Sequence, residues 1–94
     1  GGIAARLLSS LDASDPRLRS AAAQILGQAS GDDAVPALIE ATTDNDAQVR
    51  WSAVISLGRL GTAESRQALQ ALLDDDDDTV AYYAQWALDH LGAC

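Results

Sequence analysis

The stretch that decides the fold is Asp46-Ala-Gln-Val-Arg-Trp-Ser-Ala-Val-Ile-Ser-Leu-Gly58, because related stretches lie 31 residues before and after it. The first reads Asp15-Pro-Arg-Leu-Arg-Ser-Ala-Ala-Ala-Gln-Ile-Leu-Gly27. The third, more divergent, reads Asp77-Asp-Thr-Val-Ala-Tyr-Tyr-Ala-Gln-Trp-Ala-Leu-Asp89. A fixed period of this size is typical of proteins built from stacked structural repeats. The repeat therefore directs the search for function to the surface of the stack.

The hydrophobic spacing is helical throughout, and no stretch alternates with a period of two. N-cap residue types mark three helix starts, at Asp15, Asp46 and Asp77 or Asp78. Glycines mark helix ends, at Gly27 or Gly31, Gly61 and Gly92. The predicted helices run through 2–12, 16–28, 33–43, 47–60, 63–73 and 78–91. The expected fold is an all-α, right-handed α-solenoid of about three helical hairpins.

The 94 residues are enough for a single small domain. Residues 1–14 match the second half of a repeat, 15–45 and 46–76 are complete repeats, and 77–94 match the first half of a capping repeat. The chain has no Met and opens within the pattern. It is therefore expected to be a piece of a longer protein.

The motif Asp-x-x-Val-Arg-x-x-Ala-x-x-x-Leu-Gly at 46–58, together with Ala-Val-Pro-Ala-Leu-Ile-Glu-Ala at 34–41, resembles the short HEAT-like repeats named after phycobilin lyases. The resemblance covers essentially the whole chain. It implies that the positions differing between copies line a concave binding surface. Such repeats serve lyases, scaffolds and adaptors alike, so the resemblance does not select a function. The third copy departs from the pattern at Ala81, Gln85 and Asp89, which suggests a terminal, capping repeat.

A helical wheel separates a core face from an opposite face on the first helix of each hairpin. In the second copy the core face holds Val49, Ala53, Val54 and Leu57. Together with the second helices, the pattern predicts a core of Leu7, Leu11, Leu18, Ala22, Leu26, Val35, Leu38, Val49, Ala53, Val54, Leu57, Leu60, Leu69, Leu72, Val80, Ala84, Leu88 and Leu91.

The opposite face carries the candidate binding residues. In copies two and three it holds both tryptophans and both tyrosines of a chain without Phe, and we name Trp51, Ile55, Tyr82, Tyr83 and Trp86 the aromatic strip. Copy one has Ser20 and Gln24 at the same positions, as expected of a solvated face, and Arg17 and Gln48 are expected to border the strip. Stacked helices lie about 10 Å apart, so the rings are expected to form one patch. Large aromatic residues on a solvent face are typical of interfaces.

The occupant of the aromatic strip stays open at this point. A distinct protein partner, a second copy of the chain, or missing repeats of a longer solenoid would each cover it. The leading hypothesis is a non-catalytic protein-interaction or scaffold module. The alternatives are a fragment of a phycobilin lyase-like protein, in which the strip would stack on a tetrapyrrole, and a structural segment of a longer solenoid.

The charge balance restricts the partners. Fourteen acidic residues, twelve of them Asp, stand against six Arg and no Lys, for a net charge of -8. This charge opposes nucleic acid and anionic membrane surfaces. The composition resembles that of proteins from extreme halophiles. With no signal peptide or membrane-spanning run, a cytoplasmic location is the default expectation.

Catalytic and metal-binding signals are weak. The pairs Asp15/Arg19 and Asp46/Arg50 are interpreted as helix caps and bridges, either within the helix or to the neighbouring repeat. The run Asp74–Asp78 lacks the spacing of a calcium loop, which favours a solvated loop over weak ion binding. His90 is expected near a helix C-terminus, and Cys94 has no partner for a redox or zinc motif. No catalytic residue, metal or cofactor is therefore predicted.

Overall fold

The protein is seen in a computed structural model that describes residues 13–29 and 34–91. These residues form five α-helices, a 3-10 turn and no strand. The elements are α2 (Pro16–Ala29), α3 (Val35–Ala41), α4 (Ala47–Leu60), α5 (Ala63–Ala71), η2 (Leu72–Asp74) and α6 (Asp78–Leu91). The predicted all-α stack of helical hairpins is confirmed. The helix expected at 2–12 lies outside the described residues.

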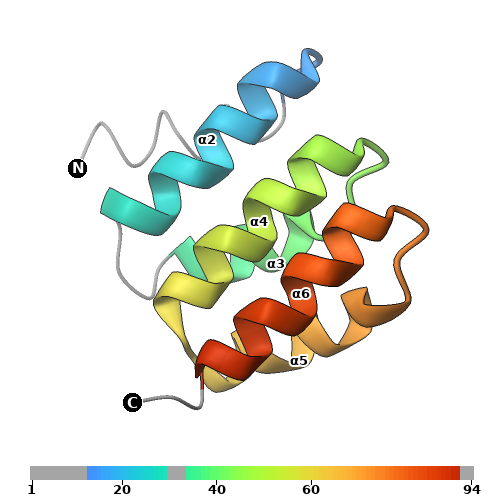
Figure 1. The fold of residues 1–94 in the computed structure, drawn as a ribbon. Helices are drawn as coiled ribbons and strands as arrows, with labels where there is room; N and C mark the ends of the chain where they lie inside the picture. The colour runs from blue at the N-terminus through green and yellow to red at the C-terminus, as the bar shows by residue number, and fades with distance from the viewer. Residues whose placement is uncertain (1–12, 30–33, 92–94) are drawn as a thin grey trace.

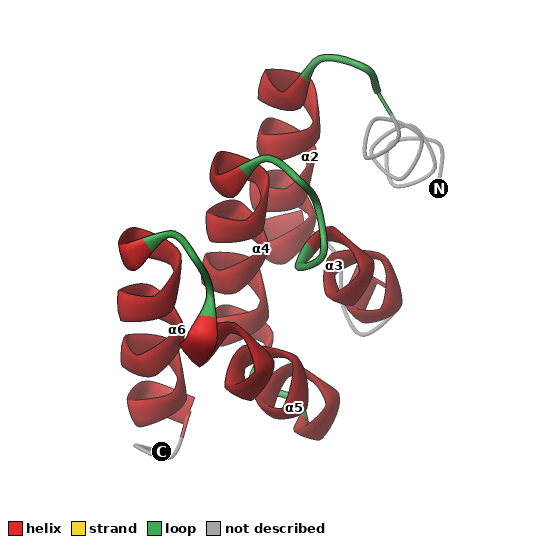
Figure 2. Ribbon diagram, turned by 90° about the vertical axis from the view of Figure 1, so that its right-hand side faces the viewer, coloured by secondary structure: helices red, strands yellow, loops and turns green. Residues whose placement is uncertain are grey.

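The helices form two layers. The longer helices α2, α4 and α6 lie side by side in one layer, and α3 and α5 lie in the other (Figures 1 and 2). The most extensive contacts join α2 to α4 and α4 to α6. The three related stretches of sequence therefore become neighbouring helices of one layer, which places their equivalent positions next to one another.

The helix starts follow the predicted caps. The Asp46 carboxylate accepts hydrogen bonds from the backbone N–H groups of Gln48 and Val49, at 2.9 and 3.3 Å. Asp77 does the same for the corresponding N–H groups of α6, at 2.9 and 3.1 Å, so Asp77 and not Asp78 is the cap. Gly61 ends α4 with a left-handed φ of 63°, a conformation that glycine adopts without strain.

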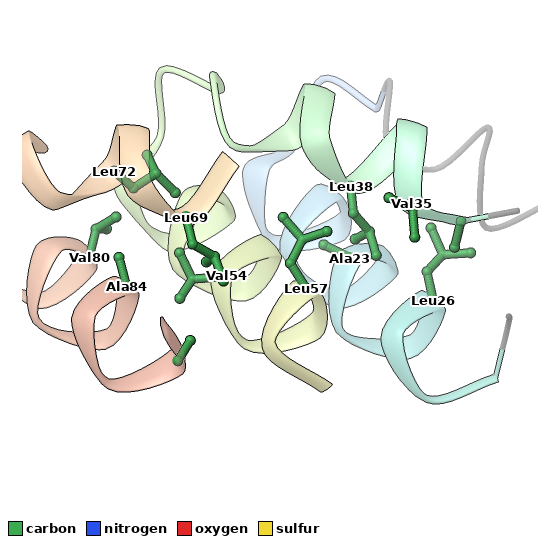
Figure 3. Packing of buried hydrophobic residues seen from close by; sticks show 12 residues of the cluster. Ala23, Leu26, Val35, Leu38, Val54, Leu57, Leu69, Leu72, Val80 and Ala84 are labelled. Carbon is green, nitrogen blue, oxygen red and sulfur yellow. The ribbon is translucent and has the colours of Figure 1, made fainter. Parts of the chain in front are cut away.

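The core lies between the two layers (Figure 3). Leu26, Leu38, Leu57 and Leu69 are at most 1% exposed and come from four different helices. Among the predicted core residues, twelve are buried: Ala22, Leu26, Val35, Leu38, Val49, Ala53, Val54, Leu57, Leu69, Leu72, Val80 and Ala84. Leu60 and Leu88 are half-buried against this core. Leu7 and Leu11 lie outside the described residues, as does the side chain of Leu91.

Leu18 corrects the core prediction, because its side chain is 57% exposed. Its equivalents are fully covered: Val49 packs in a cluster with Ala41 of α3, and Val80 in a cluster with Leu72 of η2. This position is therefore buried by the second helix of the preceding hairpin. For Leu18 the second helix of the preceding hairpin is the one predicted at 2–12, which lies outside the described residues.

Gly27 is a second correction: of the two helix-end candidates, Gly27 does not end a helix, and Gly31 lies outside the described residues. The helix α2 continues to Ala29, and Gly27 faces Ser56 on α4. A Cβ atom on Gly27 would lie only 2.7 Å from the Ser56 Cα atom. The Ser56 hydroxyl donates a hydrogen bond to the Ala23 carbonyl across the same contact. The glycine therefore allows the close approach of two helices.

Candidate functional site

The four rings of the aromatic strip form one cluster centred on Tyr83. The Tyr83 ring centroid lies 5.9 Å from that of Trp51, 5.2 Å from that of Tyr82 and 6.5 Å from that of Trp86. All three pairs meet edge to face, an arrangement that contributes about 0.5–1.5 kcal/mol per pair beyond the area it buries. The prediction that rings from two helices lie together in one patch is confirmed by these distances.

The strip has a buried side and an exposed side. Trp51 and Tyr83 are half-buried and pack against the core. Tyr82 is 65% exposed and Trp86 is 45% exposed. On the α6 wheel these two residues lie opposite the fully buried Val80 and Ala84. A firmly held inner pair thus supports an outer pair that faces solvent.

A groove opens where the first turns of α4 and α6 meet. Its volume is about 360 Å³, and it is lined by Ala47, Gln48, Trp51, Asp77, Thr79 and Tyr83. The Trp51 and Tyr83 rings and Ala47 form the apolar wall, and Asp77 and two neutral polar side chains form the rest. None of the lining residues is basic. The sequence predicted the strip and Gln48 but missed Asp77 and Thr79. The 31-residue spacing pairs Thr79 with Gln48, which was predicted to border the strip, but it pairs Asp77 with Asp46, which does not line the groove.

Trp51 carries a donor without an acceptor. Its indole Nε1 is buried and, within the described part of the chain, has no hydrogen-bond partner. Leaving a buried N–H unpaired costs about 1–3 kcal/mol. The ring contacts of Trp51 therefore stabilise the fold at the expense of one hydrogen bond.

Ser20 and Gln24 correct the predicted solvated face of copy one. Ser20 is 5% exposed, and its hydroxyl shares a hydrogen bond of 2.5 Å with that of Ser52, which is fully buried. The Gln24 amide donates to the same Ser52 hydroxyl at 3.2 Å. A wheel describes one helix alone, whereas here the neighbouring helix covers this flank. The Ser20–Ser52 pair at the α2–α4 contact thus occupies the positions that Trp51 and Tyr83 occupy one repeat later, at the α4–α6 contact.

The remaining candidates are only partly brought to the strip. Gln48 borders it, since it lines the groove with Trp51 and Tyr83. Ile55 is half-buried one turn beyond Trp51 on α4. Arg17 is on α2, with a side chain that is 89% exposed and paired with Asp15 at 3.0 Å. Nothing in the described contacts joins Arg17 to the rings.

The arginines interpreted from sequence as structural bridges, Arg19 and Arg50, hold loops. Arg19 binds both carboxylate oxygens of Asp44, at 2.9 and 3.1 Å, and Arg50 binds those of Asp75, at 2.8 and 3.0 Å. Arg50 also donates to the Asp44 carbonyl. Each guanidinium thus joins its helix to the loop before the next long helix. The expected bridge to the aspartate four residues earlier does not form: each ion pair joins the arginine to an aspartate at the end of its own repeat, and the bond from Arg50 to the Asp44 carbonyl reaches the preceding repeat.

These clamps lower carboxylate pKa values. Burial by itself raises the pKa of Asp75, but hydrogen bonds from Arg50 and the Asp77 N–H, with the Arg50 charge, outweigh it and leave the pKa below its ordinary value. The pKa of Asp44 is lowered in the same way: burial raises it, but the hydrogen bonds from Arg19 and the Asp46 N–H together lower it by more than burial raises it. Both groups therefore favour the folded state only while they are ionised.

We expect acid to weaken the fold through Asp44 and Asp75. Their pKa values are lower folded than unfolded, so their contribution is complete above about pH 4, the ordinary range of an aspartate, and is lost as the pH falls through the folded values. Thermal unfolding followed by circular dichroism between pH 6 and 2 measures this. The variant Asp75→Asn should show a shallower acid-side fall in Tm. An identical slope in wild type and variant would contradict this assignment.

The other chemical candidates form no site in the described residues. No three His, Cys, Asp or Glu side chains there are placed to hold a metal ion. Within the acidic run, Asp75 is clamped by Arg50 and Asp77 caps α6. His90 lies in the last turn of α6, stacks on Trp86 at 4.0 Å and donates from Nδ1 to the Trp86 carbonyl. Cys94 lies outside the described residues.

No helix in the described part of the chain is long and apolar enough to cross a membrane. Comparison with known families gives one result. The sequence pattern of the family described as HEAT repeats matches residues 4–89. No curated protein was found to match the chain.

Proposed function

Because the chain belongs to the HEAT repeats family, we propose that it is a non-catalytic protein-interaction module that binds its partner through the aromatic strip. HEAT repeats generally mediate protein–protein interaction and scaffolding. The observation that carries the proposal is the exposure of Tyr82 and Trp86, at 65% and 45%, on a support of half-buried rings. Exposed aromatic anchors on a rigid support are typical of binding hot spots.

The form of α6 argues against coverage of the strip by a further repeat. On α2 and α4, Ala23 and Val54 are fully buried, whereas the equivalent residue of α6 is the exposed Gln85. Asp89 stands where Gly27 and Gly58 approach the next helix. A further helix that packed on α6 in the way that α6 packs on α4 would contact the polar side chains of Gln85 and Asp89.

The missing clamp supports the same reading. Arg19 and Arg50 each bind the loop before the next long helix. The equivalent residue of α6 is Ala81, which has no charge to bind such a loop. Three positions that serve stacking on α2 and α4 have therefore changed on α6, and the capping role expected from sequence is part of the proposal.

To separate an effect on binding from an effect on folding, the test replaces the exposed residues Tyr82 and Trp86. Trp51 packs against the core, so its replacement would weaken both the fold and the strip. The double variant Tyr82→Ala/Trp86→Ala should stay folded while losing about 1–3 kcal/mol of unfolding free energy, because it removes two edge-to-face ring pairs but no buried residue. It should raise the Kd for the partner by about 30-fold or more, as hot-spot truncation does.

The partner is obtained by capture from the native lysate, and the Kd is then measured by calorimetry with the purified pair. Ile25→Ala is the matched control, since Ile25 is 44% exposed on α2, away from the strip. An unchanged Kd for the double variant would refute the strip as the binding surface. A visible absorbance shift on adding a bilin would favour the phycobilin lyase-like alternative, in which the rings stack on a tetrapyrrole.

A further inference from the structure

The groove beside the strip combines aromatic walls with a carboxylate and has no basic group in its lining. Trp51 and Tyr83 supply the rings, and Asp77 supplies the charge. Indole and phenol faces attract cations, most often the planar guanidinium of Arg. This combination of groups is complementary to a cationic side chain on the partner.

The backbone at the groove does not favour an anion. The first free N–H groups of a helix would attract negative charge. Here those of α4 are taken by Asp46, through Gln48 and Val49, and those of α6 are taken by Asp77. Both bonds to Asp77 use Oδ1, so Oδ2 keeps its capacity to accept a bond from a ligand.

The charge of the whole molecule selects the same class of partner. The net charge is -8, and the exposed residues Asp76, in the loop before α6, and Asp78, the first residue of α6, flank Asp77. The nearby Arg50 is already engaged by Asp75. A second copy of the chain would bring two acidic surfaces together, whereas a basic segment would be attracted over several ångströms.

We propose that the groove binds an arginine side chain of a basic peptide segment, with the guanidinium in the corner between the perpendicular Trp51 and Tyr83 rings and paired with Asp77. This rests on the proposed function and names the partner chemistry of the same surface. Tyr82 and Trp86 then contact apolar residues of that segment, while the arginine fixes its position along the strip.

The test uses two peptides and the intact chain. The probe is the blocked peptide Ser-Gly-Arg-Gly-Arg-Gly-Ser, and its twin carries citrulline, which has nearly the same shape without the charge, at both arginine positions. Titrations are followed by NMR at the Trp51 indole N–H and the Thr79 amide. We expect saturable shifts with the arginine peptide and at least about tenfold weaker binding of the twin, a difference of about 1.4 kcal/mol.

Two cap variants test the role of Asp77. Asp77→Asn keeps an N-cap residue type and removes the charge, and it should weaken binding of the arginine peptide about three- to fivefold. Asp46→Asn makes the same change at the equivalent cap of α4, which does not line the groove, and should change binding less than twofold. Raising the salt concentration should reduce the difference between the two variants.

The proposal is overturned if neither peptide binds, if the citrulline twin binds equally well, or if the two cap variants weaken binding equally. Failure of this inference is distinguishable from failure of the proposed function. A partner that depends on Tyr82 and Trp86 but not on Asp77 would leave the strip as an interface and remove only the arginine site. A partner that is indifferent to Tyr82 and Trp86 would refute the interface itself.

Discussion

Gly27→Ala is expected to lower the free energy of unfolding by about 3 kcal/mol, the upper range for overpacking a filled contact. The new Cβ atom would lie 2.7 Å from the Ser56 Cα atom, and it would also meet the Ser56 Cβ and Oγ atoms. Because a backbone atom is involved, α2 and α4 must move apart. That movement would also break the bond from Ser56 to the Ala23 carbonyl. Urea unfolding followed by circular dichroism measures the change.

Gly58→Ala is the matched control for Gly27→Ala. Its Cβ atom would lie 3.1 Å from the Ala87 Cβ atom, a tight contact that a shift of a few tenths of an ångström relieves. In a helix, Ala is favoured over Gly by about 1 kcal/mol, which offsets the crowding. We expect a change within about 1 kcal/mol. Equal destabilisation by the two variants would show that close approach is not what requires glycine at position 27.

Arg50→Ala is expected to destabilise the fold by about 2–4 kcal/mol, because it strands a carboxylate that is largely buried. The side chains of Arg50 and Asp75 are 15% and 7% exposed, and two hydrogen bonds join them. The variant also loses the bond to the Asp44 carbonyl. Differential scanning calorimetry should show a fall in Tm of about 8 °C or more, since each kcal/mol corresponds to about 4–8 °C in a domain of this size.

Two variants make this result specific. Arg17→Ala removes the same residue type from an ion pair whose arginine is 89% exposed, and it should change the stability by less than about 1 kcal/mol. The double variant Arg50→Met/Asp75→Leu removes both charges together and should recover much of the loss, since no unpaired charge remains. If Arg17→Ala and Arg50→Ala were equally mild, the clamp would contribute nothing to stability.

Local sequence signals predicted most of the fold. Helix caps depend on one residue and its next three neighbours, so the cap at Asp46 could be read directly from the chain and the cap of α6 could be narrowed to Asp77 or Asp78. Burial of Val54 and Leu57 followed from helical spacing, since one face of a long helix must pack against the second layer. These features depend on short stretches, which a single sequence displays in full.

Contacts between neighbouring long helices could not be predicted in the same way. Ser20 and Ser52 look solvated on a wheel, yet they meet across the α2–α4 contact. Gly27 looks like a helix end, yet it makes room for Ser56. Such roles depend on which flank of a helix the next repeat covers, and the wheel of an isolated helix does not contain that information.

Part of the candidate site was likewise predicted from the sequence, and part depends on contacts between helices. The rings of copies two and three were predicted to lie together because Trp51 and Tyr82 are one period of 31 residues apart, but the ring that meets Trp51 is that of Tyr83. The partial burial of Trp51 and Tyr83 was not predicted, because it comes from packing of the flank where the two helices touch. Asp77 was identified as a cap, but its place in the groove required the structure.

Asp89 has a consequence for the association of separate molecules at high concentration. An open stack of like units has an end face, and head-to-tail contacts that do not close build filaments. Gly27 and Gly58 admit a neighbouring helix at close range, and Asp89 puts a carboxylate at the equivalent point of α6. We therefore expect Asp89 to disfavour end-to-end polymerisation, because the α2 face of another molecule would have to desolvate this carboxylate.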